Sequence, residues 1–265
     1  MPQREHSRWD REVIEISLSR GFGLHEGDCY TRAVVAEIAG ATALAAGAAW
    51  SVRGRSSAVF GANAWRGPVT RKVVALTFDD GPCESTPGLL ELLDRHGARA
   101  TFFQCGANAE RLDGVARAVA AAGHEIGNHT YSHPALYLKM PSFVDEEITR
   151  GQRALTAIHG TAPVWFRAPY GARWFGMRRA MKSAGLTHVA WTTIARDWTL
   201  DAGGVVKRCQ AGAVPGAILC LHDGRELRAN PDIRVTLEAV AQLLPWLCDK
   251  GFELVTLSNL LCPKK

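Results

Sequence analysis

Residues 72–82 read Lys-Val-Val-Ala-Leu-Thr-Phe-Asp-Asp-Gly-Pro. The first seven of these residues are mostly apolar and β-branched, and two acids, a glycine and a proline then interrupt the run. An apolar run of strand length that ends in turn-forming residues predicts a buried β-strand over 72–78. The carboxyl end of this predicted strand therefore carries two adjacent acids, Asp79 and Asp80.

Beyond residue 82 the sequence alternates between short apolar runs and longer segments with a helical periodicity. The other predicted strands are 100–103, 125–127, 165–167, 187–191, 217–221 and 252–255. The predicted helices are 87–96, 115–122, 143–159, 174–184, 202–210 and 234–249. Such alternation is typical of βα units around a parallel sheet. We therefore expect an α/β fold with a single catalytic domain over 70–262, preceded by an N-terminal extension over 1–69.

The residues best suited to chemistry fall at one end of the predicted strands. They are Asp79 and Asp80 after the first strand, His129 after the third, Arg167 at the end of the fourth, Asp197 soon after the fifth and His222 at the end of the sixth. In a closed βα barrel the carboxyl ends of the strands meet on one face, where active sites lie. Each residue alone has an ordinary explanation, as a turn former, a strand-end cation, a loop acid or a core histidine. Their joint placement instead predicts a functional site.

Two acids and two histidines supply the groups that a metal-dependent hydrolase needs. His129 and His133 are spaced i and i+4, so on a helical turn, which Pro134 would keep short, they could bind one cation together. A carboxylate would complete a set that suits Zn²⁺ or another first-row divalent ion. Because adjacent side chains diverge on an extended chain, one of Asp79 and Asp80 can bind the metal while the other acts as general base.

Five short motifs follow one another in order after residue 76. They are Thr77-Phe78-Asp79-Asp80-Gly81-Pro82, His129-Thr130-Tyr131-Ser132-His133, Arg167-Ala168-Pro169-Tyr170-Gly171, Asp197-Trp198 and Leu221-His222. Residues 100–103 (ATFF) and 123–128 (GHEIGN) accompany them. In order and spacing these segments resemble the motif set of the polysaccharide deacetylases, which are carbohydrate esterase family four and contain a NodB-homology domain. The resemblance covers residues 70–260.

The resemblance implies a distorted (β/α)7-8 barrel and one divalent ion, which is zinc in the first place, with Co²⁺, Ni²⁺ or Mn²⁺ as alternatives. It implies that Asp80, His129 and His133 bind the metal and that Asp79 is the catalytic base. The other roles that it implies are Arg167 holding Asp79, His222 as catalytic acid tuned by Asp197, Tyr170 offering its backbone N–H to the oxyanion, and Trp198, Leu221 and Pro169 forming the substrate groove.

The implied reaction is removal of N-acetyl groups from N-acetylglucosamine units of a glycan (peptidoglycan, chitin or a chito-oligosaccharide), with release of acetate. No Gly-x-Ser-x-Gly occurs, which argues against a serine esterase. Two positions depart from the family pattern: Ile194 stands where an acid is frequent, and Cys220 stands where the Leu-x-His motif begins. Both concern the choice of substrate more than the chemistry. The alternatives are a deacylase of another acylated amino sugar or a lipid-linked sugar, and a non-catalytic glycan-binding module.

The segment 33–50 is almost wholly Ala, Gly, Val, Ile and Leu, and Arg32 and Arg53 flank it. Its length suits a membrane span or the core of a signal peptide. However, alanine and glycine contribute little to insertion, and Glu37 inside the segment is costly. An alanine-rich helix of a soluble protein explains the segment equally well. The sequence therefore leaves membrane association through 33–50 open, with the cell envelope or export slightly favoured over the cytoplasm.

Charge and cysteine content narrow the function classes further. The net charge of +5 is carried by scattered basic residues, not by one helical stripe with interleaved aromatics, so no nucleic-acid partner is expected. The seven cysteines are odd in number and form no Cys-x-x-Cys pair, so they predict no disulfide framework. Cys105 and Cys220 lie in or beside apolar runs, where a free cysteine behaves as a small core residue. The oligomeric state is not predicted.

Overall fold

The computed structural model describes residues 26–262, apart from the side chains of residues 26–30 and 33. Contacts divide the chain into two compact units, Met1–Ala48 and Ala49–Lys265. Residues 1–25 of the predicted N-terminal extension lie outside the described residues. The second unit contains the sheet and every predicted site residue.

The centre of the second unit is a sheet in which every pairing between described strands is parallel. The strands are β1 (Asn63–Ala64), β2 (Val73–Asp79), β3 (Ala100–Gln104), β4 (Glu125–Asn128), β5 (Trp165–Phe166), β6 (Thr187–Val189), β7 (Thr193–Ile194), β8 (Ala217–His222) and β9 (Glu253–Leu254). Their spatial order is β1-β6-β5-β4-β3-β2-β8-β7, and β9 pairs with β2. The predicted α/β class is confirmed.

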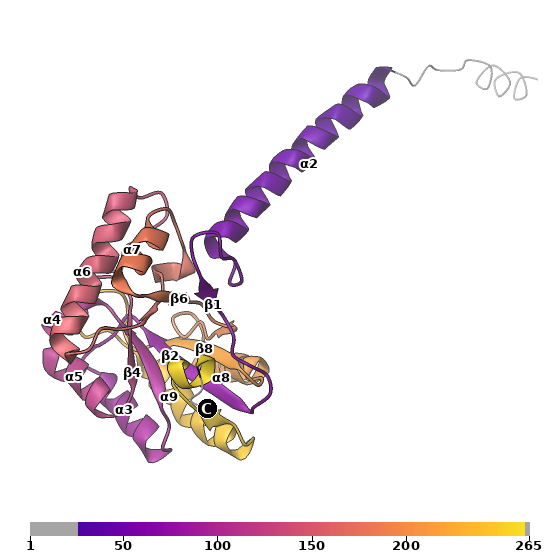
Figure 1. The fold of residues 1–265 in the computed structure, drawn as a ribbon. Coiled ribbons are helices and arrows are strands. Elements are labelled where there is room, and N and C mark those ends of the chain that lie inside the picture. The colour runs from indigo at the N-terminus through magenta and orange to yellow at the C-terminus, as the bar shows by residue number, and fades with distance from the viewer. Residues whose placement is uncertain (1–25, 263–265) are drawn as a thin grey trace, which may run out of the picture. The chain divides into compact units, whose positions relative to one another are not determined.

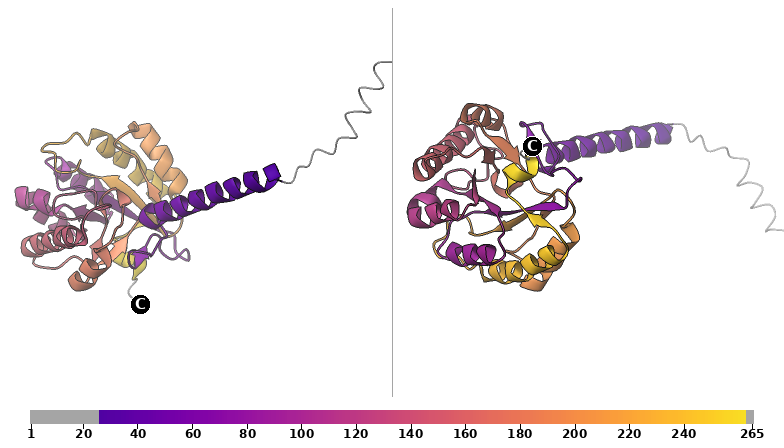
Figure 2. Two further views of the ribbon diagram at one scale, coloured as in Figure 1. Left: turned by 90° about the horizontal axis from the view of Figure 1, so that it is seen from above. Right: turned by 60° about the horizontal axis from the view of Figure 1, so that its bottom comes forward.

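The sheet curves into a half-barrel with helices around its outside (Figures 1 and 2). β2 to β6 are neighbours in space as in sequence, whereas β7 lies at the far edge beside β8. Residues 190–192 connect β6 to β7, and backbone hydrogen bonds from Ala190 to Ala64 (2.7 Å) and from Thr192 to Ile218 (2.9 Å) hold this connection on both sides. The predicted distorted barrel is therefore confirmed. The two ends of the sheet are joined by the connection over 190–192, which bonds to β1 on one side and to β8 on the other, and not by a regular pair of strands.

The helices of the described residues are α2 (Glu26–Arg53), α3 (Thr86–Arg95), α4 (Gly106–Arg111), α5 (Asp113–Ala121), α6 (Pro141–His159), α7 (Met177–Ala184), α8 (Ala202–Gly212), α9 (Arg234–Asp249) and α10 (Leu257–Leu261). The long elements of the second unit match the predicted ranges within a few residues. The elements missed by the prediction are β1, β7, α4 and α10. Strands of two residues and helices of five or six are too short to carry a hydrophobic period.

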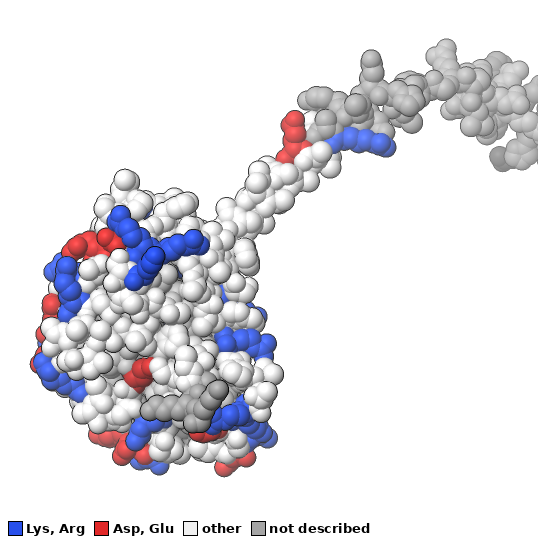
Figure 3. Space-filling model, viewed as in Figure 1, with Lys and Arg blue, Asp and Glu red and all other residues white. Residues whose placement is uncertain are grey.

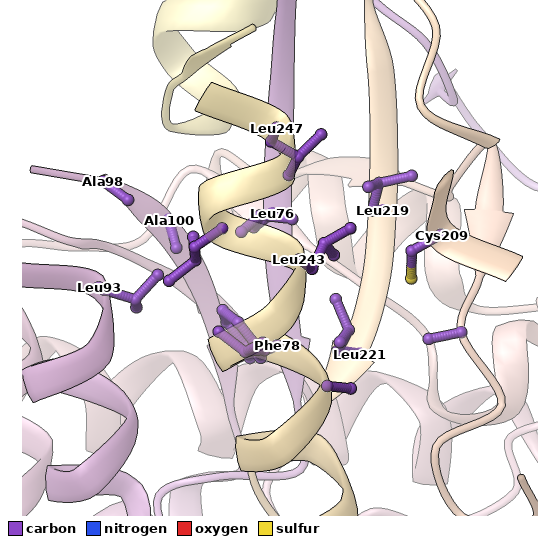
Figure 4. Packing of buried hydrophobic residues seen from close by; sticks show 14 of the residues in the cluster. Leu76, Phe78, Leu93, Ala98, Ala100, Cys209, Leu219, Leu221, Leu243 and Leu247 are labelled. Carbon is purple, nitrogen blue, oxygen red and sulfur yellow. The ribbon is translucent and has the colours of Figure 1, made fainter. Parts of the chain in front are cut away.

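The main hydrophobic core lies between α9 and the strands β2 and β8 (Figure 4). Leu76 and Phe78 of β2 and Leu219 and Leu221 of β8 point into this core, where they meet α9. Side chains alternate along a strand, so the residues between them face the interior of the barrel. This alternation turns Asp79 inward on β2 and both Cys220 and His222 inward on β8.

Helix α2 combines length with an apolar composition. It has 28 residues, and within Val34–Arg53 an 18-residue window has a mean hydropathy of 1.4 with none of its residues buried. A helix of this length and composition can cross a bilayer. The core helix of a soluble protein passes the same test but is mostly buried, which α2 is not.

The described cysteine side chains are all free thiols. Cys83, Cys105, Cys209 and Cys220 are buried, and Cys248 and Cys262 are exposed. The side chain of Cys29 lies outside the described residues. The interpretation of Cys105 and Cys220 as core residues is confirmed.

Candidate metal centre and active site

Asp80, His129 and His133 form a buried cluster just beyond the carboxyl ends of β2 and β4. The Nε2 atoms of His129 and His133 lie 3.3 and 2.9 Å from Oδ1 of Asp80. The two imidazole centroids are 5.0 Å apart. One ligand atom from each residue can be chosen so that all three lie within 4.8 Å of one another. The structure thus brings together the three residues that were predicted to bind a metal.

The hydrogen bonds around this cluster fit a bound cation. Nδ1 of His129 lies 2.7 Å from the carbonyl oxygen of Arg167 and therefore carries a proton, because a carbonyl only accepts. In a neutral His129, Nε2 is then an acceptor that faces another acceptor, Oδ1 of Asp80. A cation bound between these two atoms would remove the repulsion between their lone pairs. Two imidazoles with one carboxylate are a donor set that Zn²⁺ prefers. Burial alone would raise the pKa of Asp80, but its close contacts with the imidazoles of His129 and His133 hold that pKa well below its usual range.

Helix α4 and the loop that follows β8 hold the unusual backbone of Asp80 in place. Its φ of +73° lies in the left-handed region that few residues other than glycine adopt. Asn108 donates a hydrogen bond from its side chain to the carbonyl oxygen of Asp80 (2.8 Å), and the backbone N–H of Glu226 donates to Oδ2 (3.0 Å). Because Oδ2 is engaged, Oδ1 is the oxygen left for the imidazoles. The sequence predicted neither supporting residue.

The segment from His129 to His133 is a loop, so the prediction of a helical turn was wrong. Thr130 and His133 have φ values of +69° and +56°. Pro134 disfavours helical backbone in the residue before it, and left-handed residues interrupt a helix. Glu147 of α6 accepts hydrogen bonds from the backbone N–H and the hydroxyl of Ser132 at 2.8 and 2.9 Å. The two imidazoles therefore meet through a loop that α6 supports.

Asp79 lies beside this cluster but has different partners. Its Oδ1 accepts a hydrogen bond from Nη1 of Arg167 at 2.7 Å, and its Oδ2 lies 3.4 Å from Sγ of Cys220. Arg167 is fully buried, and its remaining hydrogen bonds run to Thr77 Oγ1 and to the carbonyl oxygens of Val189 and Ala190. A buried guanidinium with so many acceptors is held in one position, and it therefore fixes the carboxylate of Asp79.

His222 ends β8 in register with Asp79 of β2. Its Nδ1 lies 2.8 Å from Oδ1 of Asp197, and its backbone N–H donates to Oδ2 at 2.9 Å. The hydroxyl of Thr236 also donates to Oδ2 of Asp197, at 2.7 Å. Burial lowers the pKa of His222, but the negative charge of Asp197 outweighs this effect, and the pKa is raised to about 9. The imidazole is therefore protonated at neutral pH.

A cavity of about 600 Å³ joins the cluster of Asp80, His129 and His133 to the two titratable groups beside it, Asp79 and His222. Trp198 lines the cavity and packs edge-on against His222, with ring centroids 4.9 Å apart. Tyr170 also lines it, has a φ of +56°, and donates its hydroxyl to Glu226 at 2.8 Å. Among the hydrogen bonds of the described residues, none uses the backbone N–H of Tyr170.

Two predicted groove residues lie behind the cavity wall. Leu221 is fully buried and faces the core under α9, and Pro169 is buried in the turn that presents Tyr170. Neither lines the cavity. Of the two departures from the family pattern, Ile194 lines the cavity and Cys220 contacts Asp79.

Comparisons with known proteins agree with this architecture. A family model for polysaccharide deacetylases matches residues 66–189. The chain is 34% identical over 203 residues to a peptidoglycan-N-acetylglucosamine deacetylase of Bacillus cereus, covering 75% of this chain and 72% of that protein. It is 37% identical over 190 residues to a chitooligosaccharide deacetylase of Azorhizobium caulinodans, covering 68% of this chain and 90% of that protein.

The fold is likewise similar to a solved structure. A crystal structure of a peptidoglycan N-acetylglucosamine deacetylase, in complex with 4-naphthalen-1-yl-N-oxidanyl-benzamide, has a TM-score of 0.71 and 31% identity. The similarity covers 77% of this chain and 94% of that one. Sequence identity at this level over most of both proteins, together with the shared fold, shows common descent. The chain belongs to the polysaccharide deacetylases of carbohydrate esterase family four.

Proposed function

We propose that this chain is a metal-dependent hydrolase that removes N-acetyl groups from N-acetylglucosamine units of a glycan and releases acetate. The observation that carries the proposal is a single cavity that holds two kinds of group. One is the cluster of Asp80, His129 and His133, and the other is the pair of Asp79, held by an arginine, and His222, held by a carboxylate. Peptidoglycan, chitin and chito-oligosaccharides all contain the acetamido group on which such a site would act.

In this proposal Asp80, His129 and His133 bind one divalent ion. Zinc is the proposed ion, because two imidazoles and one carboxylate leave positions for water and substrate, as catalytic zinc sites do. Cobalt, nickel and manganese are the alternatives, since they accept similar donors. The ion would supply Lewis acidity toward the acetamide carbonyl oxygen and toward a water.

The other residues move protons and hold the developing charge. Asp79, oriented by Arg167, accepts a proton from the water that attacks the acetamide carbon. The unengaged N–H of Tyr170 donates to the oxyanion, and one such donor contributes on the order of 3 kcal/mol. His222, kept protonated by Asp197, gives its proton to the sugar nitrogen as the carbon–nitrogen bond breaks. The products are acetate and a free amine.

We propose that Trp198 forms a wall of the substrate groove, since its ring lines the cavity beside His222. Leu221 and Pro169 would contribute indirectly. Leu221 packs in the core next to His222 on β8, and Pro169 begins the turn that presents Tyr170. Both residues would thus place a neighbour that takes part in the reaction.

We further propose that residues 70–262 form the deacetylase domain and that 1–69 is an extension with a membrane anchor or signal at 33–50. The protein would then act in the cell envelope or after export. The length and apolar composition of Val34–Arg53 support this proposal. The end of the extension belongs to the second compact unit, because β1 pairs with β6.

Acetate and amine release by the purified full chain would test the function on chito-oligosaccharides and on peptidoglycan. We expect turnover that a chelator abolishes and that added zinc or cobalt restores. Asp80→Ala and His129→Ala should lose both turnover and bound metal, whereas Asp113→Ala, which removes an exposed acid of α5, should lose neither.

Two outcomes would contradict the proposal. Wild-type turnover in both ligand variants would overturn the metal assignment. Glycan binding without acetate release at any metal concentration would indicate the non-catalytic binding module instead.

A further inference from the structure

Large apolar side chains are exposed together in the second unit, near the end of α2. Leu138 and Met140 are 78% and 71% exposed, the highest values for large apolar side chains among the described residues of this unit. Exposed apolar residues that stand singly are ordinary, but a group of them marks an interaction surface. We define the Leu138 face as the exposed side chains of Val59, Tyr137, Leu138, Met140, Phe143 and Phe175.

Contacts between three separate segments bring the parts of the chain that carry these side chains together. The contacts are the ring packing of Phe60 on Phe175 (centroids 5.2 Å apart), the close approach of Gly176 to the backbone of Pro141, and the position of Arg53 over the ring of Tyr137 (5.9 Å). The segments around residues 53–60, 137–143 and 175–176 are therefore neighbours in space. All three belong to the second unit.

Leu138 is displayed in a way that folding in water does not explain. Its φ of +61° lies in the left-handed region, which glycine and asparagine occupy more readily than a branched apolar residue. The turn closes through a hydrogen bond from the N–H of Lys139 to the carbonyl oxygen of Leu136 (3.3 Å), without help from the Leu138 side chain. A leucine at this exposed position therefore indicates a contact outside the second unit.

Basic and aromatic residues border the Leu138 face. Lys139 lies over the ring of Phe143 at 5.5 Å, and Arg178 donates to the carbonyl oxygen of Val59. Figure 3 shows basic side chains gathered over α7 beside a largely uncharged surface. Trp50, half exposed, stands in the last turn of α2. Aromatic residues with Lys and Arg at the end of an apolar helix are typical of the boundary between a bilayer and water.

We propose that the Leu138 face lies against a bilayer that contains anionic phospholipids, with Leu138 and Met140 inserted among the headgroups. This inference rests on the anchor proposed above for α2. Arg53 is both the last residue of the candidate span and part of the cavity wall. The substrate would accordingly be glycan whose acetamido groups lie at the membrane surface.

Fluorescence quenching in the full chain tests the contact. An environment-sensitive fluorophore is attached at Leu138→Cys, in a chain with Cys29, Cys248 and Cys262 changed to serine, and the protein is reconstituted in phosphatidylcholine–phosphatidylglycerol vesicles. In the matched control the fluorophore is on native Cys248, which is exposed at the carboxyl end of α9. This end of α9 lies where the strands of the sheet begin, away from the cavity. Lipids with a nitroxide near the headgroup should quench position 138 about twofold or more relative to position 248.

The outcomes separate this inference from the proposals on which it rests. Equal quenching at the two positions, in a chain that floats with the vesicles, overturns the membrane contact of the Leu138 face. A chain that does not float overturns the anchor and the contact together. Deacetylation of a soluble chito-oligosaccharide by the same sample reports on the proposed reaction independently of either result.

A second measurement concerns the substrate. The full chain in the same vesicles is given an N-acetylglucosamine oligosaccharide either attached to a lipid or free in solution. Leu138→Asp combined with Met140→Asp should lower the ratio of lipid-attached to free turnover several-fold, with turnover of the free sugar unchanged. The control combines Val164→Asp with Val214→Asp. These two half-exposed valines lie just before β5 and β8, at the end of the sheet where the strands begin, whereas residues 137–143 follow the carboxyl end of β4. An equal fall of the ratio in this control overturns the inference.

Discussion

The strand-borne half of the site and its loop-borne half are built in different ways. Asp79 and His222 stand on β2 and β8, paired in register, and strand alternation turns both into the barrel. Asp80, His129 and His133 stand in loops at or beside left-handed backbone. The sheet itself sets the backbone positions of the first pair, whose side chains Arg167 and Asp197 then orient. The backbone positions of the second group depend instead on polar contacts from neighbouring elements. The two proposed proton-transfer groups should therefore tolerate loop changes that the proposed metal ligands do not.

The largest expected effect separates the two adjacent carboxylates. Asp79→Asn preserves the size of the side chain but removes the base, so turnover should fall about 10²–10⁴-fold while bound metal stays at the wild-type level. Asp80→Asn should lose bound metal together with turnover. Metal analysis of the purified variants and acetate release check both expectations. Equal metal loss in the two variants would show that both acids bind the ion, and the distinction between the halves would fail.

A pH profile tests the strand-borne acid. Asp197 raises the pKa of His222 to about 9, and the protonated imidazole is the form that donates, so turnover should persist below this pKa and fall as the pH rises through it. Asp197→Asn removes the negative charge and lowers the pKa of His222. The alkaline limb of the kcat profile should then move down by about one to two pH units, with a smaller loss at pH near 6.

A nearby acid provides the control for this profile. Asp201 lies four residues after Asp197 in the sequence. It caps α8 by accepting a hydrogen bond from the N–H of Gly204. Asp201→Asn changes the net charge equally but should leave the alkaline limb in place. If the alkaline limb did not move in Asp197→Asn, the limb would have to be assigned to a group other than His222.

The loop-borne half should respond to the loss of its support. Glu147 holds the histidine loop through Ser132, whereas its neighbour Glu146 pairs with Arg153 at the surface. Glu147→Ala should weaken metal binding about tenfold, the effect expected when the partners that orient metal ligands are lost. Turnover at saturating metal should stay close to wild type. Titration of activity with zinc measures this, and Glu146→Ala is the matched control that should bind metal normally.

The same contrast explains what the sequence could predict. The apolar runs at 72–78 and 217–221 carry a local signal, so the strands and the positions of Asp79 and His222 at their ends were predicted. The loop-borne group was predicted as residues but with the wrong local structure, because spacing does not report left-handed backbone. Asn108 and Glu226 were missed, since their bonds to Asp80 span 28 and 146 positions and only the fold brings them there. The sequence itself predicted that one acid binds the metal and the other acts as base, but the family resemblance assigned these roles to Asp80 and Asp79.

The smallest expected effect is at Cys220, the residue that departs from the family pattern inside the strand-borne half. Burial and the nearby Asp79 carboxylate raise its pKa well above the usual range, so it is a neutral thiol and a weak donor. Arg167 binds the other oxygen of Asp79 with a charged bond of 2.7 Å, which is stronger than the thiol contact at 3.4 Å. Cys220→Ala should therefore lower turnover by less than about tenfold.

Cys220→Ser keeps a donor at the same position, so its turnover should lie between that of the alanine variant and that of the wild type. Acetate release at saturating zinc measures the order of the three proteins. If the alanine variant lost as much turnover as Asp79→Asn, one weak hydrogen bond would be holding the base in place. The strand-borne half would then depend on a single side-chain contact, because the register of β2 and β8 would not suffice to place Asp79.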